Sequence, residues 1–156
     1  MGYISYLKLE GIAGDCSDSA HRGWMTVDSF SHSLVGPHEQ GARTSVSDVA
    51  FNRQVDRATP LLARATAEGR HFKEAVLELW TNGGSKFMEL RLTNVRISNY
   101  AVAGTPQHDV RTPFENFMLS FEKIEWLYFP NAFAASPDQE AAMCRTAWST
   151  DAKVAV

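Results

Sequence analysis

One helix signal, within Ala58–Trp80, constrains the fold of this chain more than any other stretch. We expect Thr59 to cap this helix, because its hydroxyl can accept a hydrogen bond from a free amide of the first turn. Pro60 suits the first turn, where its missing N–H costs nothing. Gly69 supplies the left-handed residue that commonly ends a helix. These signals predict one short helix over about residues 60–68, followed at once by a strand.

The predicted helix has one narrow apolar side. Leu61, Leu62 and Ala65 form an apolar stripe, whereas Arg64 and Glu68 point away from it. We therefore expect the stripe to pack on the rest of the chain, and the charged residues to face solvent or a neighbouring molecule. No second stretch has this spacing, so the helix must cover β-structure.

Most of the remaining sequence alternates apolar and polar residues, which is the period of β-strands. The clearest alternation lies on both sides of residues 81–86 and predicts a hairpin. Residues 130–146 are predicted to be a loop and 147–154 a final strand. The other strands are expected at about residues 3–10, 24–35, 43–52, 72–80, 86–93, 94–101 and 116–129.

The alternation changes phase near Asp28, between Val46 and Val49, and near Glu122–Lys123. A slip of one residue moves every side chain to the other face, so we expect bulges or strands that pass between two packed layers. The chain is long enough to bury a real core. The sequence therefore predicts a single domain over residues 1–156 that is mainly β, a compact β-barrel of two packed antiparallel sheets with one flanking helix.

Composition argues against several classes of protein. The net charge is −3 and the chain has no cationic run, which disfavours nucleic acid as a partner. Residues 1–11 lack the basic and apolar regions of a classical signal peptide, and no apolar run is long enough for membrane insertion. Cys16 and Cys144 lie outside any CxxC spacing, so we expect buried or free thiols. We expect synthesis in the cytoplasm, with export by a signal-independent machine left open.

Motifs of catalytic sites do not occur in the sequence. There is no GxSxG, GxxxxGK[ST], HExxH or GxGxxG pattern, and Gly83-Gly84 joins two alternating strands as a hairpin turn does. A metal could draw on His32, His38 and Glu39, with His108 as a further nitrogen ligand, but their spacing matches no tight ligand motif. We expect no enzyme activity, no cofactor and no metal.

Short motifs in a constant order run from residue 3 to residue 129. They are Tyr6-Leu7-Lys8-Leu9-Glu10-Gly11-Ile12, Gly14, Asp18, His21, Trp24, Val27, Ser29-Phe30-Ser31-His32, Asp56-Arg57-Ala58-Thr59-Pro60-Leu61, Glu68-Gly69-Arg70-His71, Gly83-Gly84, Met88-Glu89, Leu92, Val95, Ile97-Ser98 and Lys123-Ile124-Glu125-Trp126. By their order and spacing the chain resembles the Hcp (haemolysin co-regulated protein) family, the tube subunits of bacterial type VI secretion systems. It departs from the family pattern at 36–43, which lacks a long glycine-rich run, and in the Ala-rich tail after Pro130.

The resemblance implies a structural role. Family members form hexameric rings that stack into a tube, and a contractile sheath drives this tube, tipped by a spike, out of the bacterial cell. The lumen can hold small effector proteins. On this basis we expect a self-assembling subunit with sheath, spike and effector proteins as partners, made without a signal peptide and secreted through the machine.

The resemblance also suggests where contacts lie. The polar loop Asp15–Gly23 is expected to project from one face toward the adjacent ring, and the loop Ala103–Thr112 to form the lumen edge. Expected ring-stacking or subunit contacts are Asp15, Ser17, Asp18, His21, Arg22, Arg57, Arg64, Glu68, Glu78 and Arg91. Expected lumen or effector contacts are Gly104, Thr105 and Gln107.

Two alternatives stay open at this point. A phage-type tail-tube protein would assemble into a tube in the same way. A monomeric β-barrel could bind a small ligand or a metal through His32, His38 and Glu39. The mass in solution separates a ring of about six chains from a barrel of one or two.

Overall fold

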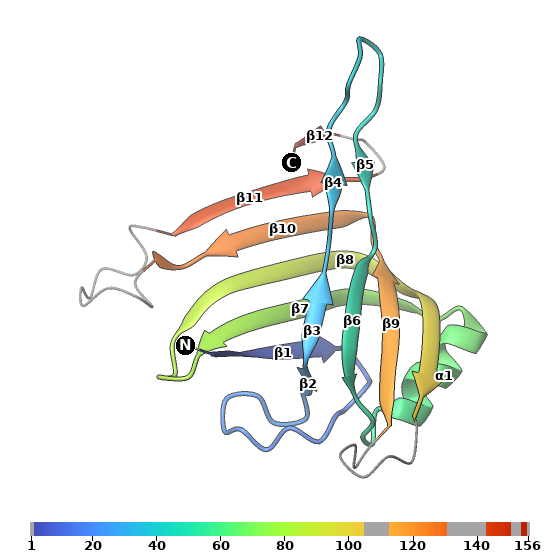
Figure 1. The fold of residues 1–156 in the computed structure, drawn as a ribbon, viewed down its shortest axis with the longest axis vertical. Helices are drawn as coiled ribbons and strands as arrows, with labels where there is room; N and C mark the ends of the chain where they lie inside the picture. The colour runs from blue at the N-terminus through green and yellow to red at the C-terminus, as the bar shows by residue number, and fades with distance from the viewer. Residues whose placement is uncertain (1, 105–112, 131–142, 151–153, 156) are drawn as a thin grey trace.

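One long strand joins the two layers of the protein (Figure 1). The computed structural model describes residues 2–104, 113–130, 143–150 and 154–155. Among these, no helix is long and apolar enough to cross a bilayer. The elements are β1 (Tyr3–Leu9), β2 (Met25–Val27), β3 (Ser29–Ser31), β4 (Leu34–Val35), β5 (Ser45–Val46), β6 (Val49–Gln54), α1 (Thr59–Glu68), β7 (His71–Thr81), β8 (Lys86–Ala103), β9 (Phe114–Ser120), β10 (Lys123–Tyr128), β11 (Cys144–Ser149) and β12 (Val154–Ala155).

Strand β8 belongs to both layers. Its first half pairs with β7 and β10, and its second half pairs with β9. The first layer has the strand order β12-β11-β10-β8-β7-β1-β2, and the second has β3-β6-β9-β8. In Figure 1 the second layer crosses the first at a steep angle. The short strands β4 and β5 pair only with each other and carry the loop of residues 36–44 away from both layers.

The predicted phase slips mark where strands end. One strand ends and the next begins at each of these places: β2 and β3 are separated by Asp28, β5 and β6 by two residues, and β9 ends shortly before β10 begins at Lys123. The hairpin of β7 and β8 is confirmed. The prediction of separate strands at 86–93 and 94–101 is wrong, because β8 runs through Asn94 with only a bulge between Ile97 and Asn99. Strand β11 begins at Cys144, inside the predicted loop.

The mainly β architecture, its two packed antiparallel layers and its flanking helix are confirmed. Closure into a barrel is not found among the described strands. Strand β2 pairs with β1 and β3 pairs with β6, but the two are joined only by the chain through Asp28. The hydrogen-bonded pairing of strands is therefore not continuous between β2 and β3. The structure has two layers that share strands, whereas the prediction was a closed barrel.

Helix α1 ends as predicted but begins differently. Gly69 has φ 65° and its N–H reaches the last carbonyls of the helix. The predicted Thr59 cap is wrong, because Ala58 holds the N-cap position without a side-chain bond. Asp56 serves the first turn instead: its Oδ1 accepts from the Ala58 N–H at 2.8 Å, and its own N–H donates to Thr59 Oγ1 at 3.0 Å.

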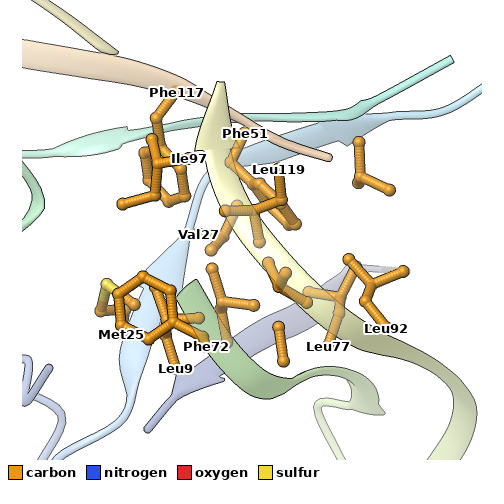
Figure 2. Packing of buried hydrophobic residues seen from close by; sticks show 14 of the residues in the cluster. Leu9, Met25, Val27, Phe51, Phe72, Leu77, Leu92, Ile97, Phe117 and Leu119 are labelled. Carbon is orange, nitrogen blue, oxygen red and sulfur yellow. The ribbon is translucent and has the colours of Figure 1, made fainter. Parts of the chain in front are cut away.

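The apolar stripe of the helix is narrower than predicted. Leu62 and Ala65 are buried, but Leu61 is 44% exposed. Leu62 and Ala65 are three residues apart and share one face of the helix. Adjacent residues point about 100° apart, so Leu61 does not pack against β8 beside Leu62. The buried side chains between the layers form one core, including those labelled in Figure 2: Leu9, Met25, Val27, Phe51, Phe72, Leu77, Leu92, Ile97, Phe117 and Leu119.

A buried ion pair interrupts this apolar core. Arg53 is 1% exposed and Glu115 is 0% exposed, and they lie on β6 and β9 at positions where the alternation points inward. Arg53 Nη1 lies 2.5 Å from Glu115 Oε1, and its Nη2 lies 2.6 Å from Asp56 Oδ2. Arg53 Nε donates to Thr26 O at 3.2 Å, and Tyr100 Oη donates to Glu115 Oε2 at 2.7 Å. Every charged atom of the pair therefore has a partner.

We predict that Arg53→Met lowers the free energy of unfolding by about 3–5 kcal/mol, because Glu115 would be left buried without its cation. The double variant Arg53→Met with Glu115→Leu should recover at least half of this loss, since no fully buried charge remains; Asp56 loses its cation in both variants but keeps its hydrogen bonds from the Asp15 and Ala58 amides. Urea denaturation followed by circular dichroism measures both. A double variant no more stable than Arg53→Met would contradict this account.

Candidate assembly surfaces

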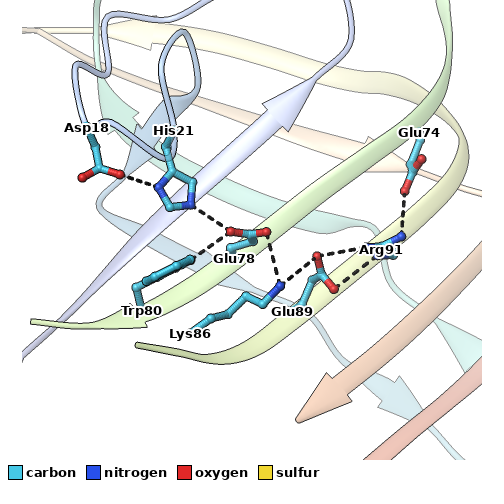
Figure 3. Close-up of polar contacts among 8 residues, drawn as sticks. All are labelled: Asp18, His21, Glu74, Glu78, Trp80, Lys86, Glu89 and Arg91. Atoms are coloured by element: carbon cyan, nitrogen blue, oxygen red, sulfur yellow. Dashed lines mark hydrogen bonds and ion pairs between the residues drawn. The ribbon is translucent and has the colours of Figure 1, made fainter. Parts of the chain in front are cut away.

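The outer face of the first layer carries charged side chains that neutralise one another (Figure 3). Glu78 on β7 and Glu89 on β8 lie directly opposite in the register, which would be repulsive without a cation. Lys86 Nζ lies between them, 3.6 Å from Glu78 Oε2 and 3.8 Å from Glu89 Oε1. Arg91 Nε lies 3.2 Å from Glu89 Oε2, and its Nη1 lies 3.8 Å from Glu74 Oε1. This face is therefore not a free charged patch.

The same arrangement continues onto β10 and β11. Glu125 is the register partner of Arg91. Arg145 Nη2 donates to Glu125 Oε1 at 2.9 Å, and Lys123 Nζ lies 3.3 Å from the same oxygen. Burial alone would raise the pKa of Glu125, but the two cations lower it more, so its pKa lies below the usual value.

His21 fastens the polar loop of residues 15–23 to this face. Its side chain is 2% exposed, with Nδ1 2.7 Å from Asp18 Oδ2 and Nε2 2.8 Å from Glu78 Oε1. The ring stacks on Tyr6 at a centroid distance of 3.8 Å, and Trp24 and Trp80 meet it edge-on. The predicted contact residue His21 thus lies inside the subunit, and part of the loop folds back onto the sheet instead of projecting.

The pKa values of the two carboxylates follow from the geometry of this cluster. Both ring nitrogens of His21 face carboxylate oxygens, which only accept hydrogen bonds. The hydrogen bond from His21 lowers the pKa of Asp18. Burial would raise the pKa of Glu78, but hydrogen bonds from His21 and Trp80 and the charge of Lys86 lower it more. Both carboxylates therefore stay ionised to a lower pH than usual.

The other predicted contact residues of the loop lie at the surface. Ser17, Asp18 and Arg22 are exposed. Asp15 Oδ1 lies 2.5 Å from Nε of Arg57, whose side chain is 71% exposed. Contacts of these four loop residues with an adjacent ring stay a prediction.

The predicted contacts on the helix and the sheet are each engaged within the chain. Arg64 Nε donates to Glu68 Oε1 at 2.7 Å on the exposed side of α1. Glu78 and Arg91 belong to the row of charges on the first layer. Exposed ion pairs contribute little to stability, so the helix pair is free to exchange partners with a neighbouring molecule.

The outer face of the second layer contrasts with that of the first. Among the described outward residues of β3, β6, β9 and the half of β8 that pairs with β9, only Arg96 carries a formal charge, and it lies at the edge of the surface opposite Ser120. We call this surface the uncharged face; its members are Ser29, Ser31, Ala50, Asn52, Gln54, Asn99, Ala101, Ala103, Phe114, Asn116, Met118 and Ser120. The predicted lumen residue Gly104 lies exposed at its end, whereas Thr105 and Gln107 lie outside the described residues.

The alternative metal set is not brought together. His32 lies half-buried beside β4, 3.5 Å from Ser47 Oγ, whereas His38 and Glu39 lie in the exposed loop between β4 and β5. His108 lies outside the described residues. Across the described part of the chain, no three His, Cys, Asp or Glu side chains are placed to hold a metal ion.

Sequence reasoning missed two features of these surfaces. It did not show that Glu89, on the outer face of β8, is buried under Lys86 and Arg91. It also read His21 as a loop contact, although its partner Glu78 is 57 residues away. The one signal in the sequence was that a histidine, His21, stands among small polar residues. This signal did not indicate which residue His21 would contact.

The fold defines the class of this protein: two crossing antiparallel layers that share one long strand, with a single flanking helix. A family described as "Type VI secretion system effector, Hcp" matches residues 6–128, and the chain belongs to this family. Protein hcp1 of Pseudomonas aeruginosa is 24% identical over 148 residues, covering 88% of this chain and 90% of its own length.

Solved structures share the fold. Hcp1 from Salmonella typhimurium superposes with a TM-score of 0.83 at 21% identity, covering 100% of both chains. A type VI secretion system effector from Yersinia pestis superposes with a TM-score of 0.77 at 22% identity, covering 94% of this chain and 99% of its own.

We predict that His21→Ala releases the loop from the sheet. The substitution removes two charge-assisted hydrogen bonds and a stacked ring, so the free energy of unfolding should fall by about 2–4 kcal/mol. Hydrogen exchange should accelerate at the amides of Cys16, Gly23 and Trp24, which bond within the loop or to its flanks. His71→Ala is the matched control, because His71 is exposed on β7. Unchanged exchange in His21→Ala would contradict the anchoring role.

The low pKa of Glu78 predicts how stability depends on pH. A carboxylate whose pKa is lower in the folded state contributes stability that is present above its unfolded pKa and is lost as the pH falls through the folded pKa. The stability difference between the wild type and Glu78→Gln should therefore be full at pH 7 and shrink between about pH 5 and pH 3. Urea denaturation at each pH measures it. An equal difference at pH 7 and pH 3 would exclude this linkage.

Proposed function

We propose that this chain is the inner-tube subunit of a type VI secretion system. On this proposal it forms hexameric rings, the rings stack into a tube, and the tube is expelled from the cell with small effector proteins in its lumen. Membership of the Hcp family and the resemblance along residues 3–129 support this role. The role is mechanical and associative, so it requires no catalytic residue or cofactor.

The observation that carries the proposal is the contrast between the two outer faces. The first layer presents charges that are paired with one another, whereas the uncharged face presents small, amide and apolar side chains. A ring needs an outside exposed to other proteins and an inside that admits cargo. We assign the uncharged face to the lumen, because a wall without formal charge repels cargo of neither sign.

The partners follow from this arrangement. The self-neutralised face of the first layer is assigned to the outside of the tube, where the sheath lies. The arm of β4 and β5 extends from the body. Together with the exposed residues Ser17, Asp18 and Arg22 of the loop of residues 15–23, it is assigned to contacts between stacked rings. The spike would cap the last ring through the same contacts.

We predict that the purified full chain forms rings in solution. Size-exclusion chromatography with light scattering should give about six chain masses of 17.3 kDa each. Negative-stain electron microscopy should show rings with a central hole. Single globular particles of one or two chain masses at all concentrations would contradict the tube role.

A further inference from the structure

The first layer extends beyond the part of it that the second layer covers. Ile124, Trp126 and Tyr128 on β10 all point toward the core side of the sheet. Ile124 is fully buried, Trp126 is half-buried and Tyr128 is 44% exposed. His32, next to the second layer, lies 6.3 Å from the Trp126 ring between centroids. Among the described residues, the cover over β10 therefore ends at Trp126.

The neighbouring strands show the same limit. Met88, the register partner of Tyr128 on β8, is half-buried, and Cys144, its partner on β11, is exposed. At the corner of the sheet, Tyr3 is 55% exposed and meets Phe87 edge-on at 5.9 Å between centroids. We call Tyr3, Met88, Tyr128 and Cys144 the first overhang. It is apolar, aromatic and free of formal charge.

The second layer has an overhang of its own at the other end. Ile97, Tyr100 and Val102 on β8 point toward the core, as their register with Leu119, Phe117 and Glu115 shows. Their exposure rises in the same way: Ile97 is buried, Tyr100 is half-buried and Val102 is 54% exposed. We call the end of β8 around Val102 the second overhang. In Figure 1 the tip of β10 and the end of β8 lie at opposite sides of the molecule.

We propose that the first overhang of one subunit packs against the second overhang of the next copy of this chain, as a lap joint. The inference rests on the proposed ring and names the contact that builds it. Each overhang exposes side chains on the core side of its strand. Within the described part of the chain no second layer covers them, and the other overhang can supply that layer. Joining them continues the two-layered core across the subunit boundary.

The chemistry and position of the overhangs favour a second copy as the occupant. The first surface is aromatic and without formal charge, which is the composition of interface cores, and the second exposes the apolar Val102 above a Glu115 that is already paired with Arg53. Because they lie at opposite ends and differ from each other, the contact is heterologous, and such a contact makes a closed ring when its rotation closes. A partner that bound only the first overhang would leave the exposure of the Val102 side chain, at the second overhang, unexplained.

The test compares substitutions at the two overhangs in the full chain. Tyr128→Ser and Val102→Ser should each raise the concentration of half-assembly at least about tenfold, read by light scattering across a dilution series. Tyr128→Phe is the matched control and should assemble like the wild type, because the joint uses the ring and not the hydroxyl. Circular dichroism and thermal unfolding check that each variant folds. Tyr3→Ser gives a second measurement should Tyr128→Ser not fold.

Mixing the two variants tests the direction of the joint. A Tyr128→Ser chain keeps its second overhang and a Val102→Ser chain keeps its first, so an equimolar mixture should form pairs held by one intact joint, without rings. A wild-type ring that survives Tyr128→Ser unchanged would overturn this inference and leave the tube role standing. Tyr128→Ser dimers, or a wild type that stops at two chains, would overturn the head-to-tail arrangement. A wild type that stays monomeric would overturn the inference and the proposed function together.

Discussion

The buried guanidinium of Arg53 holds together the parts of the chain that the surfaces depend on. It joins β6 to Glu115 on β9, to a carbonyl of β2 and to Asp56 ahead of the helix. Removing these charges from water costs several kcal/mol, so the pair adds little net stability compared with apolar side chains. Its effect is on arrangement, because any shift of β6 against β9 would leave a buried charge without a partner.

The position of the outer loop follows from this ion pair. Asp56 accepts from the Asp15 N–H at 2.9 Å, which brings the loop against the start of the helix. A Cβ on Gly14 would lie 2.6 Å from Trp24 O and 2.9 Å from Met25 Cγ, so only glycine allows this close approach. The loop then reaches the outer face, where His21 binds Glu78. One path of polar contacts thus runs from the core to the surface.

The sequence predicted what depends on neighbouring residues. Alternation located the β7–β8 hairpin, phase slips located the breaks near Asp28 and Glu122, and Gly69 ended the helix. It missed what depends on distant residues: the partners Arg53 and Glu115 are 62 positions apart, and His21 and Glu78 are 57 apart. The Thr59 cap failed for a local reason, because Ala58 holds the N-cap position and the Thr59 hydroxyl accepts from the Asp56 amide ahead of the helix. The candidate contacts came from the family resemblance, which names regions and not the partners of each side chain.

The paired charges and the overhangs act together on assembly. A sheet face of unpaired charges would attract many partners through long-range fields, whereas a face whose charges are already paired has little to gain from a new contact. Exposed core residues at two ends then become the places where association removes apolar surface from water. In the proposed ring, a subunit built this way associates along one direction, through its overhangs, and leaves its outer face available for weaker and reversible contacts.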